Sequence, residues 1–560
     1  MSRILLSLVA ALPLALPLAA ASPPSLLDIL NDELQRNFTI LKQKADPPPY
    51  YMDYTVTDEE AQSVTAMMGA LVSHNKNRLR YLDITLRVGT PQLDNYHLVN
   101  GQRARFTPGE VLPLDNVPDA IRRKVWLATD RTYRLAARRL IEIKSNQETK
   151  VKGADDSADF SSEPPSVYEE PPPAMTPIDA EWAQRARRWS ADVAKSPDVL
   201  YSAVSITARS ISKYMVSTEG SRLLHGRDFA GVVIEASGKA PDGMDLTAME
   251  DFQAADLAHL PPQSVLDAAA TQVGDNLSKL VQAPAVEPFV GPAILSGRAA
   301  AVFFHEIFGH RIEGHRQKNE AEGQTFTKSV GMPVLPSFLS VFFDPTRKTL
   351  DGMDLNGSYS YDDEGVKARP VTVVDNGILK TFLMSRSPIP GVDHSNGHGR
   401  RQPGLEVVSR QSNLIVQSTK QVSDKALRQM LIAEVKRQNK PYGLYFDEVT
   451  GGYTTTQRRG LQAFTVIPLM VYRVFPDGRP DELVRGVDIV GTPLASFSKI
   501  LATSDKTEVF NGYCGAESGQ VPVSATSPAL LVSEIEIQKK QHAQDRLPFL
   551  GPPQDLGASQ

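Results

Sequence analysis

The chain has 560 residues, of which 41% are hydrophobic and 22% are charged, and its formal net charge is -5. This length suits two or more domains with a substantial core, and the acidic balance argues against nucleic acid as the main partner. Nothing after the first residues is long and apolar enough to cross a membrane.

The N-terminus has the pattern of a secretory signal peptide. A basic start at Met1 to Arg3 precedes an apolar run over residues 4–18 and three alanines that end at Ala21. The pattern predicts residues 1–21 as a signal peptide, and therefore a periplasmic or secreted protein. A retained membrane anchor is the alternative, although Pro13 and Pro17 interrupt a run that is short for a spanning helix.

Residues 22–285 have the mixed patterns of an α+β domain. Alternating apolar residues indicate strands, whereas a helical period that is rich in alanine and arginine indicates helices. The expected strands cover 50–57, 62–72, 81–88, 203–211 and 232–236, and the expected helices cover 117–147, 178–194 and 264–283.

Two segments have compositions typical of flexible chain. Residues 146–177 are acidic and rich in proline, with the runs Glu163–Pro165 and Glu169–Pro173. Such a stretch carries little apolar surface to bury, so it is predicted to be a flexible loop. The polar, proline-containing residues 541–560 are predicted to be a flexible tail.

Strand patterns dominate residues 286–540. A buried strand is expected at 290–296 and a buried helix from Gly297 onwards. Asp375–Gly377 and Pro476–Gly478 are typical hairpin turns. Further helices are expected at 423–438 and 493–503. The predicted fold class is α+β, with a mixed N-terminal domain and a β-rich C-terminal domain that carries a metal-binding helix.

The strongest functional motif is His305-Glu306-x-x-x-His310. Imidazole is a common metal ligand, and a glutamate beside it is suited to take a proton from a metal-bound water. Five positions correspond to about 140° around a regular α-helix, so the two histidines would point apart. One extra residue in the turn, as in a π-bulge that Gly309 would permit, would bring them together. The alternative is that both are ordinary core or surface histidines.

Cys514 is the only cysteine, and it lies in the glycine-rich segment 511–520. A buried apolar role is the ordinary interpretation of a free cysteine. The flanking glycines instead favour a third metal ligand, which leaves a fourth tetrahedral position open as in catalytic zinc sites. His315 is an alternative third ligand, and the acidic run Asp362–Glu364 is a weaker candidate for calcium.

Two further segments are candidates for substrate binding. His398 could stabilise an oxyanion and Arg400 could bind a peptide carboxylate, although an ordinary surface turn is equally consistent with their sequence. Gly451, Gly452 and Tyr453 could form a strand edge that pairs with the backbone of a substrate.

These motifs resemble the TldD/PmbA family of metallopeptidases, specifically the TldD-like branch with H-E-x-x-x-H. The resemblance is carried by the segments around His305, 361–365, 375–380, 396–401 and 512–523, and it is specific from about Pro288 to Lys539. It implies zinc held by His305, His310 and Cys514, with Glu306 as the base. It also implies cleavage of linear peptides within an enclosed dimer, either a homodimer or a heterodimer with a related subunit.

The leading hypothesis is an exported zinc metallopeptidase that hydrolyses unfolded or linear peptides, with Glu306 as general base on zinc-bound water. The alternative is a non-catalytic binding or assembly subunit of a TldD/PmbA-like complex with a structural metal. Glu306 argues against the alternative, because a structural site needs no base.

Overall fold

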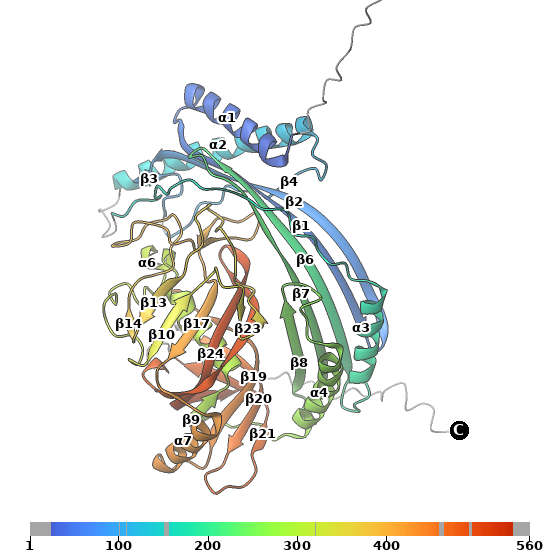
Figure 1. Ribbon diagram of the computed structural model, residues 1–560. Helices are drawn as coiled ribbons and strands as arrows, with labels where there is room; N and C mark the ends of the chain where they lie inside the picture. The colour runs from blue at the N-terminus through green and yellow to red at the C-terminus, as the bar shows by residue number, and fades with distance from the viewer. Residues whose placement is uncertain are drawn as a thin grey trace, which may run out of the picture.

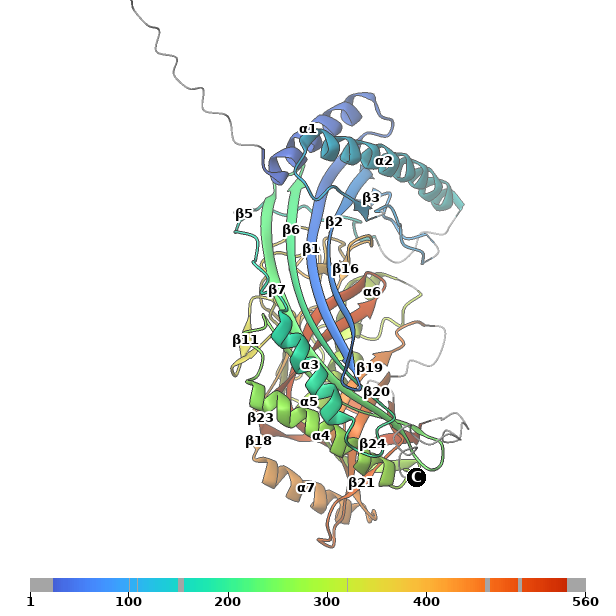
Figure 2. The ribbon, with the colours of Figure 1, turned by 90° about the vertical axis from the view of Figure 1, so that its right-hand side faces the viewer.

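The computed structural model describes residues 24–99, 101–107, 109–149, 156–319, 321–458, 464–491 and 496–540. Two large β-sheets organise these residues, one of eight strands and one of twelve. Figures 1 and 2 show the first sheet as a long curved layer, with the second sheet and its surrounding loops on the concave side.

The eight-stranded sheet is largely antiparallel and is built from very long strands. Its path is β3-β2-β1-β6-β7-β5, while β4 pairs with β2 and β8 pairs with β7. The strands are β1 (Pro49–Met67), β2 (Ala70–Thr90), β3 (Leu93–Asp94), β4 (Glu110–Val111), β5 (Val167–Glu169), β6 (Tyr201–Ser217), β7 (Arg222–Lys239) and β8 (Asp245–Ala254).

The first two strands form one hairpin, whereas the sequence predicted three shorter strands at 50–57, 62–72 and 81–88. The turn lies at Met68 and Gly69, both with positive φ. The polar residues between the first two predicted strands stay in β1 because they pair across the sheet. Asp58 is 2.9 Å from the Nε of Arg78 and 2.7 Å from the Nη2 of Arg80. The cross-strand ion pairs thus replace the apolar alternation that the prediction relied on.

Four helices cover the first sheet: α1 (Leu26–Lys44), α2 (Pro118–Thr149), α3 (Ala180–Val193) and α4 (Gln263–Gln282). The helices α1 and α2 cross one end of the long strands, and α3 and α4 lie on the convex face (Figure 2). The last three match the predicted helices 117–147, 178–194 and 264–283, because each has a continuous apolar stripe to bury. The helix α1 was not predicted; a capping box between Ser25 and Asp28 marks its start.

The prediction of a flexible loop over 146–177 is wrong for residues 156–177. This segment contributes β5, which pairs in parallel with β7. Phe160 is 5% exposed, and its ring lies between the guanidinium groups of Arg87 and Arg386, each 3.9 Å from the ring centroid. Both nitrogens of the Arg386 fork also donate to the carbonyl of Ser161. These contacts with distant residues supply the order that its own composition does not. Residues 150–155 lie outside the described part.

The twelve-stranded sheet forms the second half of the chain. Its path is β14-β13-β10-β17-β24-β22-β20-β19-β9, while β18 and β24 pair with β23 and β21 pairs with β20. The strands are β9 (Phe289–Leu295), β10 (Leu339–Phe343), β13 (Val371–Asp375), β14 (Ile378–Leu379), β17 (Asn413–Ser418), β18 (Gln421–Val422), β19 (Gly443–Thr454), β20 (Phe464–Val474), β21 (Glu482–Val484), β22 (Val487–Gly491), β23 (Ile500–Ala516) and β24 (Gly519–Lys539).

Shorter elements complete this half. The largest apolar core of the described residues packs between the sheet and the helix α5. The other elements are the helices α5 (Gly297–Ile307), α6 (His315–Lys318) and α7 (Asp424–Arg437), the 3-10 helix η1 (Gly309–Ile312), and the strand pairs β11 (Thr349–Leu350) with β12 (Met353–Asp354) and β15 (Gly399–Arg400) with β16 (Val408–Ser409).

Most predicted elements of this half are present. The turn at Asn376 and Gly377, both with positive φ, joins β13 to β14, and α7 matches the helix predicted at 423–438. The helix predicted at 493–503 is wrong from Ile500, where β23 begins; residues 492–495 lie outside the described part. There the pairing between β23 and β24 overrides the helical spacing of the apolar residues.

The fold class is therefore α+β, as predicted, with a β-rich second half. The two sheets divide the described chain between α4 and β9, close to the boundary predicted at 285/286. Whether each half folds as an independent domain stays a prediction.

The prediction of a periplasmic or secreted protein is wrong as it stands. It depended only on residues 1–21, and residues 1–23 lie outside the described part of the chain. No helix among the described residues has the length and apolar character to cross a membrane. Nothing described gives positive support for export. The predicted tail 541–560 also lies outside the described part.

Candidate metal centre

The helix α5 places His305 and Glu306 at its buried C-terminal end. The hydroxyl of Ser296 accepts a hydrogen bond from the amide of Ala299 and so caps the start of the helix. Phe303 and Phe304 are at most 1% exposed and pack against the ring of Phe497. Because α5 is anchored along its apolar length, its last turn holds the two polar side chains in fixed positions.

His310 comes from the next element, and the predicted π-bulge is not what brings it beside His305. The α-helix ends at Ile307, Phe308 is the C-cap, and the 3-10 helix η1 begins at Gly309. This break between two helices replaces the extra residue that a π-bulge would supply. The imidazole centroids of His305 and His310 are 5.1 Å apart, with the rings at 83°.

Gly309 is required here for close approach, and its φ is not in the left-handed region. A Cβ at this position would lie 1.9 Å from the Oε1 of Gln411, which is closer than any real contact. The Nε2 of Gln411 is 3.5 Å from the Nε2 of His305 and donates to the carbonyl of the same residue at 3.3 Å. The absent side chain thus leaves room for an amide that contacts the first histidine.

Cys514 reaches the two histidines from the hairpin of β23 and β24, where it pairs with Val521. Its Sγ lies 3.4 Å from the Nε2 of His310, and one ligand atom from each of the three residues lies within 4.8 Å of the others. All three side chains are buried. Tetrahedral zinc with bonds of about 2.0–2.3 Å separates its ligand atoms by roughly 3.3–3.8 Å. The 3.4 Å between the Sγ of Cys514 and the Nε2 of His310 lies in this range, and the donor set suits a zinc ion with three protein ligands.

The charges of the cluster favour the ligating form of the cysteine. Burial alone would raise the pKa of the Cys514 thiol, but His310, His305 and Arg410 together hold it well below its usual range. Burial disfavours protonation of His310, yet Cys514 and Glu313 raise its pKa well above the usual value. A thiolate is the form in which cysteine binds zinc.

Glu313 and Arg410 support the cluster from behind. The Oε2 of Glu313 lies 3.4 Å from the Nδ1 of His310 and 2.9 Å from the Nε of Arg316. Arg410 donates to the carbonyl of Cys514 at 2.6 Å. Although burial opposes its ionisation, Arg316 and His310 lower the pKa of Glu313 to about 2. This carboxylate stays charged and orients the second histidine, as partners behind metal ligands commonly do.

Glu306 lies beside the cluster without being part of it. Its side chain is buried, and its Oε2 is 3.9 Å from the Nε2 of His310. Burial raises the pKa of Glu306, an effect that His305 and His310 oppose. A Cβ at Gly452 would come within 2.8 Å of the Cγ of Glu306, so the strand β19 runs directly along this carboxylate.

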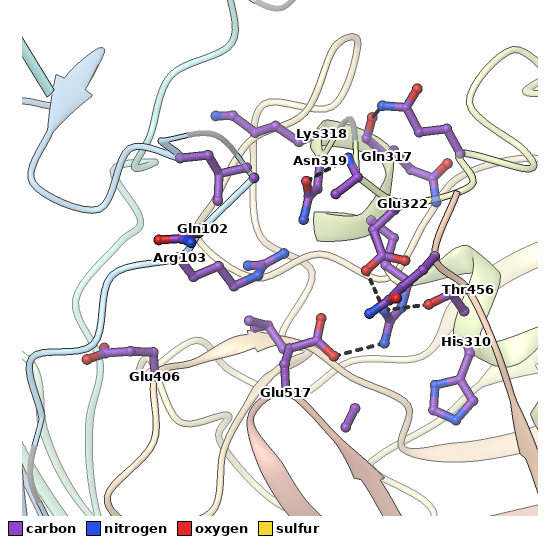
Figure 3. A pocket seen from close by; sticks show the side chains of 18 of the residues that line it. Gln102, Arg103, His310, Gln317, Lys318, Asn319, Glu322, Glu406, Thr456 and Glu517 are labelled. Carbon is purple, nitrogen blue, oxygen red and sulfur yellow. Dashed lines mark hydrogen bonds and ion pairs between the residues drawn. The ribbon is translucent and has the colours of Figure 1, made fainter. Parts of the chain in front are cut away.

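The cluster opens into a cavity of about 2970 Å³ that is lined by both halves of the chain. His305, Glu306, His310 and Cys514 form part of its wall. Figure 3 shows Arg103 reaching into this cavity from the first half, opposite Glu322 and Glu517 of the second half, together with Gln102, Lys318 and Glu406.

Of the predicted substrate-binding residues, only some line this cavity. Gly452 and Tyr453 do, whereas Gly451, His398 and Arg400 are not part of its lining. His398 is fully buried, and burial lowers its pKa to about 3. Arg400 lines a second cavity of about 1740 Å³, with its guanidinium over the ring of Tyr359. Neither side chain lines the cavity of the metal cluster, although Arg400 donates to the carbonyl of Gln411 at 2.6 Å; the roles predicted for His398 and Arg400 stay predictions.

The alternative metal ligands are also placed elsewhere. The Nε2 of His315 lies 2.5 Å from the Oε1 of Glu517. Asp362 accepts hydrogen bonds from backbone amides, and Asp363 pairs with Lys213. Among the described residues, no cluster with metal-ligand spacing includes His315 or these acidic residues.

Sequence reasoning missed the supporting residues of the site. Glu313 follows His310 by three positions, and that spacing is a usable signal for a carboxylate behind a ligand. Arg410, Gln411 and Arg103 carry no comparable signal, because only the tertiary fold brings them to the site.

Comparisons with known proteins found matches in sequence and in fold. Residues 290–539 match the model of the PmbA/TldA metallopeptidase C-terminal domain. The chain is 28% identical over 232 residues to a metalloprotease of Methanocaldococcus jannaschii, covering 41% of this chain and 47% of that protein. It is 28% identical over 275 residues to a zinc metalloprotease TldD homolog of Saccharolobus solfataricus, covering 48% and 56%. The matches thus span about half of each relative.

A solved structure shows the same fold over most of the chain. TldE from Thermococcus kodakarensis superposes with a TM-score of 0.60 at 12% identity, covering 91% of this chain and 100% of that one. At this identity the likeness concerns the fold alone. The matched C-terminal domain and the names of the curated relatives support the TldD/PmbA family, and the fold is shared with TldE.

Proposed function

We propose that the protein is a zinc-dependent metallopeptidase that hydrolyses linear or unfolded peptides. The observation that carries the proposal is the convergence of His305, His310 and Cys514 beside Glu306 in the wall of one large cavity. The zinc metalloprotease name of a relative supports the choice of metal. Three protein ligands leave one tetrahedral position for water or substrate, which is the pattern of catalytic zinc.

His305, His310 and Cys514 would hold the ion, which when bound polarises a carbonyl and lowers the pKa of water. Glu306 accepts a proton from the attacking water and then returns a proton to the leaving amine. Burial raises the pKa of Glu306 above its usual value, so the carboxylate is a stronger base than an exposed one. Glu313 keeps His310 oriented throughout.

The strand β19 offers a backbone template for the peptide. Its partner β20 pairs with Gly451, Gly452 and Tyr453 on one edge, while β9 pairs only with Leu444–Phe446 on the other. In the described part of the chain, the second edge therefore has no paired strand at Gly452 and Tyr453, which line the cavity. An extended peptide that pairs with this edge would pass Glu306 with little side-chain preference.

The size of the cavity supports linear substrates. A folded domain of 100 residues has a radius of gyration of about 13 Å, too large for a cavity of about 2970 Å³. We further propose that the active form is a dimer with a second copy or a related subunit, which would enclose the cavity.

The experiment compares two variants of the purified protein. Glu306→Gln should keep zinc but lose at least about 100-fold in peptide hydrolysis, because the amide is no base while every ligand is intact. Cys514→Ser should lose both zinc and hydrolysis. Near wild-type turnover in Glu306→Gln would refute the assigned base, and zinc retention without hydrolysis in the wild-type protein would favour a non-catalytic assembly subunit with a structural metal.

A further inference from the structure

Arg103 lies on the segment between β3 and β4 and extends into the cavity that contains the metal cluster (Figure 3). It comes from the first half of the chain, whereas the metal cluster belongs to the second. Any role for Arg103 in substrate binding rests on the proposed peptidase function, because this cavity is where a peptide would bind.

The guanidinium of Arg103 lacks the partners that a buried cation normally has. Its Nη2 is buried and, among the described residues, has no hydrogen-bond partner. No carboxylate of the described chain forms an ion pair with it either. Burial lowers the pKa of the Arg103 guanidinium, an effect that the charges of Glu517, Glu322 and Glu313 oppose from beyond ion-pair distance. Buried arginines are normally paired with an acid, because desolvation of a lone cation is costly.

The carboxylates that face Arg103 are already engaged by another arginine. Arg316 lies 2.9 Å from Glu313, 3.2 Å from Glu322 and 3.0 Å from Glu517. Figure 3 shows Glu322 and Glu517 in the same cavity as Arg103, with their ion pairs as dashed lines.

A second cation that lines the cavity is also engaged. Lys318 donates to the carbonyls of Ser157 and Ala158 at 3.3 and 2.8 Å. The guanidinium of Arg103 therefore remains available to donate hydrogen bonds to a group that enters the cavity.

We propose that Arg103 is a specificity-determining residue that binds a carboxylate of the peptide substrate. A guanidinium presents two parallel N–H groups that match the two oxygens of a carboxylate, and the bond is strong when it is shielded from water. A linear peptide has such a group at its C-terminus, and acidic side chains supply the same chemistry. The metal cluster and Arg103 line one cavity, so a single peptide can contact both.

The experiment measures peptide binding without turnover. The zinc-loaded Glu306→Gln protein is titrated against three fluorescein-labelled hexapeptides by fluorescence anisotropy. The first has a free C-terminal carboxylate and no acidic side chain, the second is its C-terminal amide, and the third is the amide with one internal glutamate. Either carboxylate peptide should bind about 10- to 100-fold more tightly than the plain amide, and the tighter of the two identifies the source of the carboxylate.

The same titrations are repeated with Arg103→Gln added. The preference for a carboxylate should disappear, while affinity for the plain amide stays unchanged. Arg103→Lys should recover part of the preference, because it restores the charge without the paired donors. Arg105→Gln is the matched control: Arg105 lines the same cavity but is exposed, so its removal should leave the preference intact. Unchanged zinc content and thermal midpoint show that each variant is folded.

Equal affinity for all three peptides in the Glu306→Gln protein would overturn the proposal, as would a carboxylate preference that survives Arg103→Gln. Because binding is measured without hydrolysis, these results are separate from a failure of the peptidase function. That failure would appear as absent turnover in the wild-type protein with the binding preference intact.

Discussion

Gly309 shapes the metal centre through the side chain that it lacks. Any Cβ there would meet the amide of Gln411, and Gln411 in turn contacts His305. The constraint is steric, because the backbone conformation of Gly309 is one that other residue types can also adopt. It links the turn between α5 and η1 to the segment between β16 and β17 that carries Gln411, so a change at one affects the other.

Gly309→Ala is expected to weaken zinc binding by about 10- to 100-fold, because the added methyl must displace Gln411 or the turn at a cost of about 1–3 kcal/mol. Zinc affinity is measured by competition with a chromogenic chelator. The double variant Gly309→Ala/Gln411→Ala removes the clash and should recover most of the affinity, with Gln411→Ala as the matched control. Wild-type affinity in Gly309→Ala would show that the site absorbs the methyl without distortion.

At the residue scale, the sequence is enough to identify candidate site residues whose chemistry is distinctive. The spacing of His305, Glu306 and His310 and the single cysteine Cys514 are visible without a structure. Their assignment as ligands and base stays a prediction until metal content is measured. Arg103 could not be found in this way, because the property that matters is an absent partner, which only the fold determines.

Elements from both halves meet at a group of carboxylates around Arg298 of α5. Glu448 of β19 lies 3.3 Å from the Nε of Arg298, and Glu250, Asp447 and Glu508 are close enough to interact with it. Burial raises the pKa of Glu448 from 4.5 to about 7, helped by the other carboxylates and opposed by Arg298. The interface of β8, β19 and β23 thus carries a carboxyl group that is protonated more readily in the folded state.

This raised pKa makes stability depend on pH. The folded state binds the proton more tightly, so the contribution of Glu448 is complete below pH 4.5 and is lost as the pH rises to about 7. Glu448→Gln, which stays neutral, should raise the thermal midpoint above the wild-type value at about pH 8 and leave it unchanged at about pH 4. Glu287→Gln, at a carboxylate that is 75% exposed, is the control. Equal effects of Glu448→Gln at both pH values would contradict the expectation.

The segment 156–177 is a second test at the scale of elements, because its order depends on Phe160. Phe160→Ala removes a ring that is packed between two arginines and against Tyr51, with centroids 4.7 Å apart. The free energy of unfolding should fall by about 3–5 kcal/mol in a urea titration. Val167→Ala, at a side chain that is 75% exposed, should change it by less than about 0.5 kcal/mol. A negligible effect of Phe160→Ala would instead support the original prediction of a flexible loop.

Helices and hairpins were predictable where their signals are local. The helices α2, α3, α4 and α7 follow from apolar periodicity, and the turn at Gly377 follows from its residue types. The order of residues 156–177 and the strand from Ile500 were not predictable, because both depend on partners far along the chain. Periodicity reports which face is buried, and it carries no information about a distant cation or a paired strand.

At the scale of the whole molecule, the cavity is a joint product of the two halves. The second half supplies the metal cluster and the strand β19, while the first half closes the opposite wall with Arg103 and its neighbours. The α+β class and the family were accessible from sequence motifs. The cavity wall that the first half supplies could not be predicted, because the sequence resembles the TldD/PmbA family specifically only from about Pro288 onwards.

The central claim is that His305, His310 and Cys514 hold a zinc ion on which peptide hydrolysis depends. The most direct measurement removes the metal with a chelator, then follows hydrolysis of an unfolded peptide before and after one equivalent of zinc is added. We predict that the zinc-free protein is inactive and that one zinc per chain restores hydrolysis in the wild-type protein but not in Glu306→Gln. Full hydrolysis by protein that contains no zinc would contradict the claim.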